Sequence, residues 1–144
     1  MIRTFLVALV LVGCTESDPT PVPAISGLYQ VHRTEIYGHY GPALAWPTDY
    51  ELAISDGMVT MITTPTRDAL EVAREDNHLV FHIVETWTSP AGNVITPHVD
   101  YELDATIDGG LTGRASGIAE IVTGPLYTPP TVIDLTFDVS AIHE

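Results

Sequence analysis

Apolar and polar residues alternate with a period of two through most of this chain, and this pattern constrains the fold more than any other feature. In DYELAIS, residues 49–55, the apolar residues Tyr50, Leu52 and Ile54 fall on one side of an extended strand. No run of ten or more residues carries the apolar stripe of an amphipathic helix. The sequence therefore predicts an all-β domain.

Eight segments show this strand pattern: 27–37, 49–55, 58–64, 69–74, 78–88, 94–107, 111–122 and 132–142. Nearly all of them have one polar face, which is typical of antiparallel sheets that expose one side to water. The alternation places Leu70, Val72 and Ile107 among the inward-facing residues.

The connections between these segments alternate in length. Short turns (56–57, 75–77 and 108–110) alternate with longer loops (38–48, 65–68, 89–93 and 123–131). The dipeptide Asp56-Gly57 favours a type I′ hairpin, which needs positive φ at both central residues. In an up-and-down meander, alternate connections lie at the same end, so we expect a cup with one tight end and one open mouth. Eight antiparallel strands suit a closed barrel, which removes exposed sheet edges.

The domain resembles the lipocalins in its eight strands, its long first loop, and Gly27-Leu28-Tyr29 at the first strand, where Tyr29 stands in place of the tryptophan of that superfamily. The resemblance implies an up-and-down barrel that holds one small ligand. The alternative fold is a two-sheet Greek-key β-sandwich.

The N-terminus carries a short apolar run, Thr4 to Gly13, after Arg3. A bilayer core needs about 20 apolar residues, so the run has the size of a signal-peptide core and is too short for a membrane span. Its end, Leu11-Val12-Gly13-Cys14, resembles the lipobox of bacterial lipoproteins. That resemblance implies that residues 1–13 are a signal peptide and that Cys14 carries diacylglycerol and a fatty acid such as palmitate. The alternative is a plain secretory signal with an incidental cysteine.

Residues 14–24 follow the lipobox and contain three prolines and two acids, a composition that favours an extended tether. In a Gram-negative cell, Thr15 at the position after the lipidated cysteine implies the outer membrane by family analogy. Residues 25–144 remain for one folded β-barrel domain.

The chain has a formal net charge of −14 and contains no lysine. The negative field disfavours nucleic acid and anionic lipid as partners and attracts cations. The absence of lysine excludes a Walker-type phosphate loop. The stretch GRASG, residues 113–117, is not a nucleophile elbow. We therefore expect a protein that is not an enzyme and needs no cofactor.

Two groups of residues are candidates for a site. Inside the barrel, Arg33, Glu35 and Glu85 fall in the inward register near the mouth, where they would orient a ligand above an apolar floor. The alternative is that twisted strand ends let these charges reach solvent. The predicted ligand-binding residues are Tyr29, Arg33, Trp46, Phe81, Glu85, Trp87 and Tyr101.

On the outer face, His78 and His82 share one side of a strand, and pairing around residues 89–93 sets His82 beside Asp100 or Glu102. These four residues are a candidate site for a divalent cation. The alternative is a solvated acidic face with ordinary histidine pairs.

These features predict an envelope lipoprotein, lipid-anchored and in the outer membrane, whose barrel binds a small, partly apolar molecule. The alternative is a structural or protein-interaction lipoprotein with a filled barrel. A filled interior would favour the second interpretation.

Overall fold

A computed structural model of the chain describes residues 21, 24–37, 48–90, 92–123 and 131–144. All regular structure in this part is β-strand. The strands are β1 (Gly27–Tyr37), β2 (Asp49–Ser55), β3 (Met58–Ile62), β4 (Arg67–Asp68), β5 (Leu70–Glu75), β6 (His78–Val84), β7 (Trp87–Thr88), β8 (Val94–Ala105), β9 (Leu111–Thr123) and β10 (Thr131–His143). Cys14 and Trp46 lie outside the described residues.

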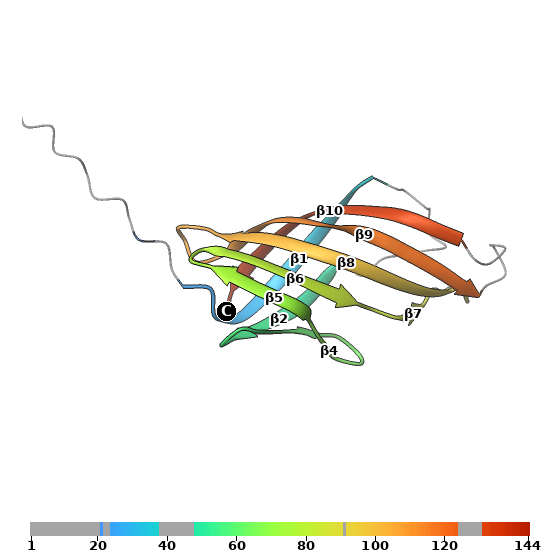
Figure 1. Cartoon of the computed structure of the whole chain (residues 1–144), viewed down its shortest axis with the longest axis horizontal. Coiled ribbons are helices and arrows are strands. Elements are labelled where there is room, and N and C mark those ends of the chain that lie inside the picture. Colours follow the sequence, from blue (N-terminus) through green and yellow to red (C-terminus); the bar gives the residue numbers. More distant parts are fainter. Residues whose placement is uncertain (1–20, 22–23, 38–47, 91, 124–130) are drawn as a thin grey trace, which may run out of the picture.

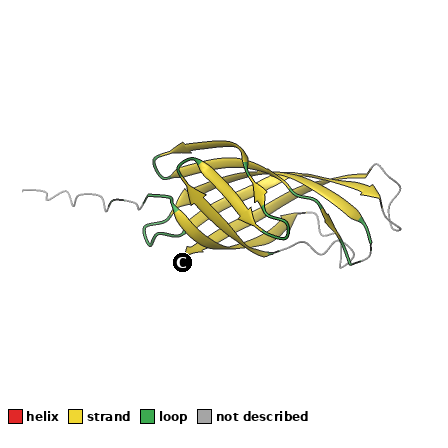
Figure 2. Ribbon diagram, turned by 90° about the horizontal axis from the view of Figure 1, so that it is seen from below, coloured by secondary structure: helices red, strands yellow, loops and turns green. Residues whose placement is uncertain are grey.

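The strands form one antiparallel sheet that is nearly closed into a barrel (Figures 1 and 2). Its order is β4-β3-β2-β1-β10-β9-β8-β6-β5, with β7 paired to β8. Only Ala69 separates β4 from β5, and only two residues separate β6 from β7, so these pairs act as two continuous strands. The result is the predicted eight-stranded up-and-down barrel, in which consecutive strands pair and β1 pairs with β10. The Greek-key alternative is wrong.

The tight turns gather at one end of the barrel. Asp56 and Gly57 have φ of 38° and 82°, as the predicted type I′ turn requires. The turns between β5 and β6 and between β8 and β9 lie at the same end, which is also where β1 begins and β10 ends (Figure 1). We call this the turn end. β1 ends and β2 begins at the opposite end of the barrel, and we call it the loop end.

The inward-facing side chains of the strands fill the barrel. Tyr29, Val31 and Arg33 of β1 are all buried, as the alternation predicts. The middle inward positions of β9 hold the small residues Ala115 and Ala119, and Ala115 lies between Tyr101 of β8 and Phe137 of β10. The small side chain leaves room for the two aromatic rings. Ile25, just before β1, is also fully buried in the core.

The prediction that Leu70 and Ile107 face inward is wrong. Leu70 is 55 % exposed. A bulge at Glu71 (φ 53°) puts one extra residue between Leu70 and Ala73. Leu70 therefore pairs with the outward-facing His82 and faces outward with it. Ile107 is also exposed, because β8 ends at Ala105 and Ile107 belongs to the following turn. Val72 packs against the core as expected.

The barrel has one seam, between β3 and β5. β4 pairs with β3 through two residues, whereas β5 pairs with β6. Among the described strands, β5 therefore pairs with β6 along one edge, and its other edge is an edge of the sheet. Among the described residues, no helix is long and apolar enough to cross a membrane.

Candidate functional site

A buried ion pair lies inside the barrel toward the loop end. Arg33 comes from β1, and Glu85 follows β6 with the same inward register as Phe81 and Ile83. The Glu85 N–H donates to the Pro97 carbonyl at 3.0 Å, which keeps this stretch beside β8. Arg33 Nη1 lies 3.2 Å from Glu85 Oε1, and Nη2 lies 3.5 Å from Oε2. Arg33 is 2 % exposed, and a buried charge of this kind requires such a partner.

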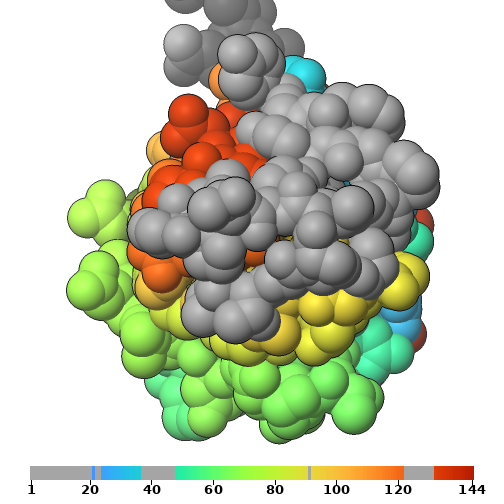
Figure 3. All heavy atoms as spheres, turned by 90° about the vertical axis from the view of Figure 1, so that its right-hand side faces the viewer, coloured from blue at the N-terminus to red at the C-terminus, as the bar shows by residue number. Residues whose placement is uncertain are grey.

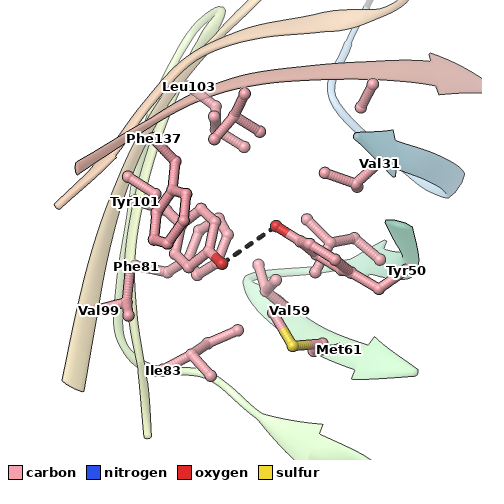
Figure 4. Close-up of a cluster of buried hydrophobic side chains, with 14 of the residues drawn as sticks. Val31, Tyr50, Val59, Met61, Phe81, Ile83, Val99, Tyr101, Leu103 and Phe137 are labelled. Carbon is pink, nitrogen blue, oxygen red and sulfur yellow. Dashed lines mark hydrogen bonds between the residues drawn. The ribbon is translucent and has the colours of Figure 1, made fainter. Parts of the chain in front are cut away.

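Two tyrosines complete the polar cluster. Arg33 Nη1 also donates to the Tyr101 hydroxyl at 2.8 Å. The Tyr50 hydroxyl donates to the Tyr101 hydroxyl at 3.1 Å, which is the dashed line in Figure 4. The Arg33 guanidinium carbon lies 5.2 Å from the centre of the Tyr50 ring and 4.9 Å from that of Phe137. These distances are within the range of cation–π attraction.

The cluster has a defined charge state. Burial raises the pKa of both Tyr50 and Tyr101, so both phenols stay neutral at physiological pH. Burial alone would lower the pKa of Arg33, but Tyr101 and Glu85 outweigh it and hold that pKa above its ordinary value. The guanidinium is therefore charged, and the Glu85 carboxylate faces it at ion-pair distance.

Aromatic rings fill the middle of the barrel. Phe81 stacks on Tyr101, with ring centres 4.7 Å apart and planes 6° from parallel. Figure 4 shows Phe81, Tyr101 and Phe137 packed side by side, with Tyr50 reaching across to Tyr101. Side chains thus occupy the space that a deeply bound ligand would need.

A half-open pocket of about 300 Å³ lies above this cluster at the loop end, and we call it the mouth pocket. It spans the side of the barrel where β2, β3 and β4 approach the β6–β7 step. Its lining residues are Asp49, Tyr50, Ile62, Thr63, Thr64, Pro65, Arg67, Glu85, Thr86 and Trp87. Seen from the loop end, the green residues of the β3–β5 region and the yellow residues around β7 and β8 lie next to each other on one side of the molecule (Figure 3).

The structure divides the predicted ligand-binding residues among three places. Glu85 and Trp87 line the mouth pocket. Arg33, Phe81 and Tyr101 form the packed middle. Tyr29 lies at the turn end, where its hydroxyl donates to the Ser26 carbonyl at 3.4 Å and its ring meets the edge of His143.

The sequence reasoning missed most of the pocket wall. The sequence predicts a strand at residues 58–64 and a connecting loop at 65–68, and the pairing of β3 with β4 brings residues 62–67 to Trp87. One signal was present, because Arg67 is one of only five arginines in a chain that contains no lysine. A lone arginine in a loop of an acidic protein is a candidate for a binding role.

The outer-face histidines form separate pairs. His82 lies opposite Asp100, as one of the two predicted registers requires, with Nδ1 2.8 Å from Oδ1. His78 lies opposite Asp104, again with Nδ1 at 2.8 Å, and its Nε2 lies 3.6 Å from Glu102. The hydrogen bond to Asp104 raises the pKa of His78 above its ordinary value.

These pairs do not make a metal centre. Among the described residues, no group of three or more His, Cys, Asp or Glu side chains is placed to hold a metal ion. His78, His82, Asp100 and Glu102 therefore lie along one face without converging on one point. Nothing in the arrangement of the described residues points to catalysis.

Comparisons with known proteins give no match: no family model, no curated protein and no solved structure is significantly similar to this chain.

Proposed function

We propose that this chain is an envelope lipoprotein, anchored through Cys14 in the outer membrane, whose barrel binds a small, partly apolar ligand in the mouth pocket. The observation that carries the binding proposal is the pocket itself, which opens at the loop end beside Trp87 and Glu85. Its volume is at the lower bound of about 300–1,000 Å³ that is usual for ligand sites. The ligand is therefore small, and it stops at the layer of Tyr50 and Glu85.

The lining suits a ligand with an apolar body and a polar end. Ile62, Pro65 and Trp87 supply apolar surface, and the remaining lining residues supply hydroxyl, carboxylate and guanidinium groups. Arg33 fixes the Glu85 carboxylate from below through the two contacts described above. A polar group held in place before binding costs less to order when the ligand arrives.

Fluorescence of Trp87 tests this proposal. The chain contains two tryptophans, so a Trp46→Phe variant isolates the signal of Trp87. We expect octanol or a similar short amphiphile to shift that emission. Thr64→Phe, inside the pocket, should weaken binding about tenfold by filling space, whereas Thr66→Phe in the same loop but outside the lining should leave it unchanged. Unchanged emission with every short amphiphile would reject the binding function.

The packed interior favours a second candidate, a protein-interaction lipoprotein with a filled barrel. Phe81, Tyr101 and Phe137 occupy the middle, and the exposed β5 edge offers backbone groups to an added strand. A photo-crosslinker at Leu70 on this edge should then capture a specific envelope protein, while one at Ser116 on the outer face of β9 should not. Capture at both positions, or at neither, would contradict this candidate.

A further inference from the structure

We propose that the mouth pocket selects a cationic ligand, an ammonium group on a short apolar body, and places the cation against Glu85. This inference rests on the proposed function, because it requires that the pocket binds a small molecule. It names the chemical class of that molecule.

The buried arginine is not accessible to an anionic ligand. Arg33 does not line the mouth pocket and is 2 % exposed. Its Nη1 contacts Glu85 and Tyr101, and its Nη2 contacts Glu85. A ligand entering from the loop end therefore meets the Glu85 carboxylate before it reaches the guanidinium. A carboxylate oxygen can accept a charge-assisted hydrogen bond from an ammonium group, whereas it offers no donor to an anion.

The charges of the lining point the same way. Among the described lining residues, Glu85 and Asp49 present carboxylates and Arg67 presents the single guanidinium. Hydrogen bonds from His32 and Thr48 lower the pKa of Asp49, so this carboxylate stays ionised at neutral pH. Arg67 Nη1 donates to the Thr66 carbonyl at 3.4 Å, within its own loop. Over longer distances, the net charge of −14 raises the local concentration of cations.

Aromatic surface is available for the same cation. Tyr50 and Trp87 both line the pocket, and indole is the strongest of the side-chain cation–π acceptors. The Tyr50 ring already faces the Arg33 guanidinium, whose carbon lies 5.2 Å from the ring centre, so we assign the ligand's cation to the Trp87 side of the pocket. Carboxylates combined with aromatic rings are the chemistry that recognises alkylammonium groups.

A series of three ligands of one length tests the inference on the Trp46→Phe chain. Octylamine, octanol and octanoate share an apolar body and differ in charge. We expect the ammonium to bind about tenfold more tightly than the alcohol at neutral pH, as one charge-assisted hydrogen bond provides. Octanoate should bind most weakly.

Two charge variants and their matched controls locate the effect. Asp49→Asn should weaken octylamine binding about threefold, and Arg67→Gln should strengthen it by a similar factor, with octanol unaffected by either change. Asp68→Asn is the control for Asp49→Asn, because it removes a negative charge from an exposed residue of β4 outside the lining. Arg74→Gln is the control for Arg67→Gln, because it removes a positive charge from an exposed residue of β5. Both controls should leave octylamine binding unchanged.

The outcomes separate this inference from the proposed function. If the three ligands bind equally, or if octanoate binds most tightly, the cation selectivity is wrong and the binding function stands. If Asp68→Asn weakens octylamine as much as Asp49→Asn, the attraction is diffuse and the inference is overturned. If none of the three ligands shifts the Trp87 emission, the proposed binding function fails as well.

Discussion

Arg33 and Glu85 are separated by 52 residues in the chain and meet inside the barrel, with Nη1 3.2 Å from Oε1. Both charges are removed from water, and each is compensated by the other. The pair closes the packed middle of the barrel, and its Glu85 side lines the mouth pocket. A single contact therefore connects the stability of the core with the chemistry of the candidate site.

Removing one member of this pair should destabilise the fold strongly. In Arg33→Leu, the Glu85 carboxylate stays buried without its cation, and breaking a buried pair in this way costs about 3–5 kcal/mol. We expect the free energy of unfolding, measured in urea, to fall by that amount.

The double variant Arg33→Leu, Glu85→Leu provides the control for this prediction. Replacing both charges with apolar groups of similar size removes the unpaired charge, and such replacements are often neutral or stabilising. Most of the lost stability should therefore return. A double variant as unstable as the single one would show that packing around Arg33, and not its charge, is what matters.

The close approach of β8 and β9 gives a second prediction. A Cβ added at Gly117 would collide with the backbone carbonyl oxygen of His98, which cannot move without disturbing the strand. We expect Gly117→Ala to lower the free energy of unfolding by about 1–3 kcal/mol, as overpacking usually does.

Ser116→Ala is the matched control, because Ser116 is the neighbouring residue and is exposed. Its effect should stay within about 0.5 kcal/mol, as for most surface changes. Equal effects of the two substitutions in thermal or urea unfolding would contradict the steric explanation.

The strand pattern was readable from the sequence because a period of two fixes which side chains turn inward. This rule placed Arg33 and Glu85 inside even though both are charged. It failed at Leu70, because one extra residue at Glu71 reverses the faces of a strand and nothing in the local sequence marks that bulge.

The alternation does not predict which side chains of distant strands contact one another. The sequence placed Arg33 and Tyr101 on inward faces, but the hydrogen bond between them depends on the barrel's closure through β9 and β10. The sequence therefore predicts that Arg33 contacts a ligand, whereas in the structure its guanidinium contacts Glu85 and Tyr101. The sequence also did not place residues 62–67 beside Trp87, because the strand pattern of residues 58–64 assigns faces but not distant neighbours, and the loop at 65–68 has no periodicity from which to assign a face.

The anchor gives a third prediction, which rests on the sequence alone. Cys14→Ser should remove the only thiol of the chain and with it the acylation that the lipobox implies. We expect the wild type to partition into detergent and to carry the added mass of lipid in mass spectrometry, and the variant to do neither. A wild-type chain without lipid would reject the lipoprotein proposal while leaving the barrel and its pocket unaffected.

The outer-face pair of His78 and Asp104 gives a fourth prediction, on pH. The hydrogen bond to Asp104 raises the pKa of His78 in the folded state above the value of 6.5 expected for an unfolded chain. A raised folded-state pKa means that folding binds protons, so this stabilisation is fully present below about pH 6.5 and disappears as the pH rises through the folded-state pKa. His78→Gln should therefore cost more stability at pH 5.5 than at pH 8.5.

The variant Asp104→Asn isolates the cause of this pH dependence. With the carboxylate gone, the main contribution that raises the pKa of His78 is lost, and the cost of His78→Gln should become nearly the same at the two pH values. The measurement is urea unfolding of the wild type, the two single variants and the double variant at each pH, which gives a double-mutant cycle for the pair. A coupling between His78 and Asp104 that stayed constant from pH 5.5 to pH 8.5 would show that protonation of His78 does not stabilise this face of the barrel.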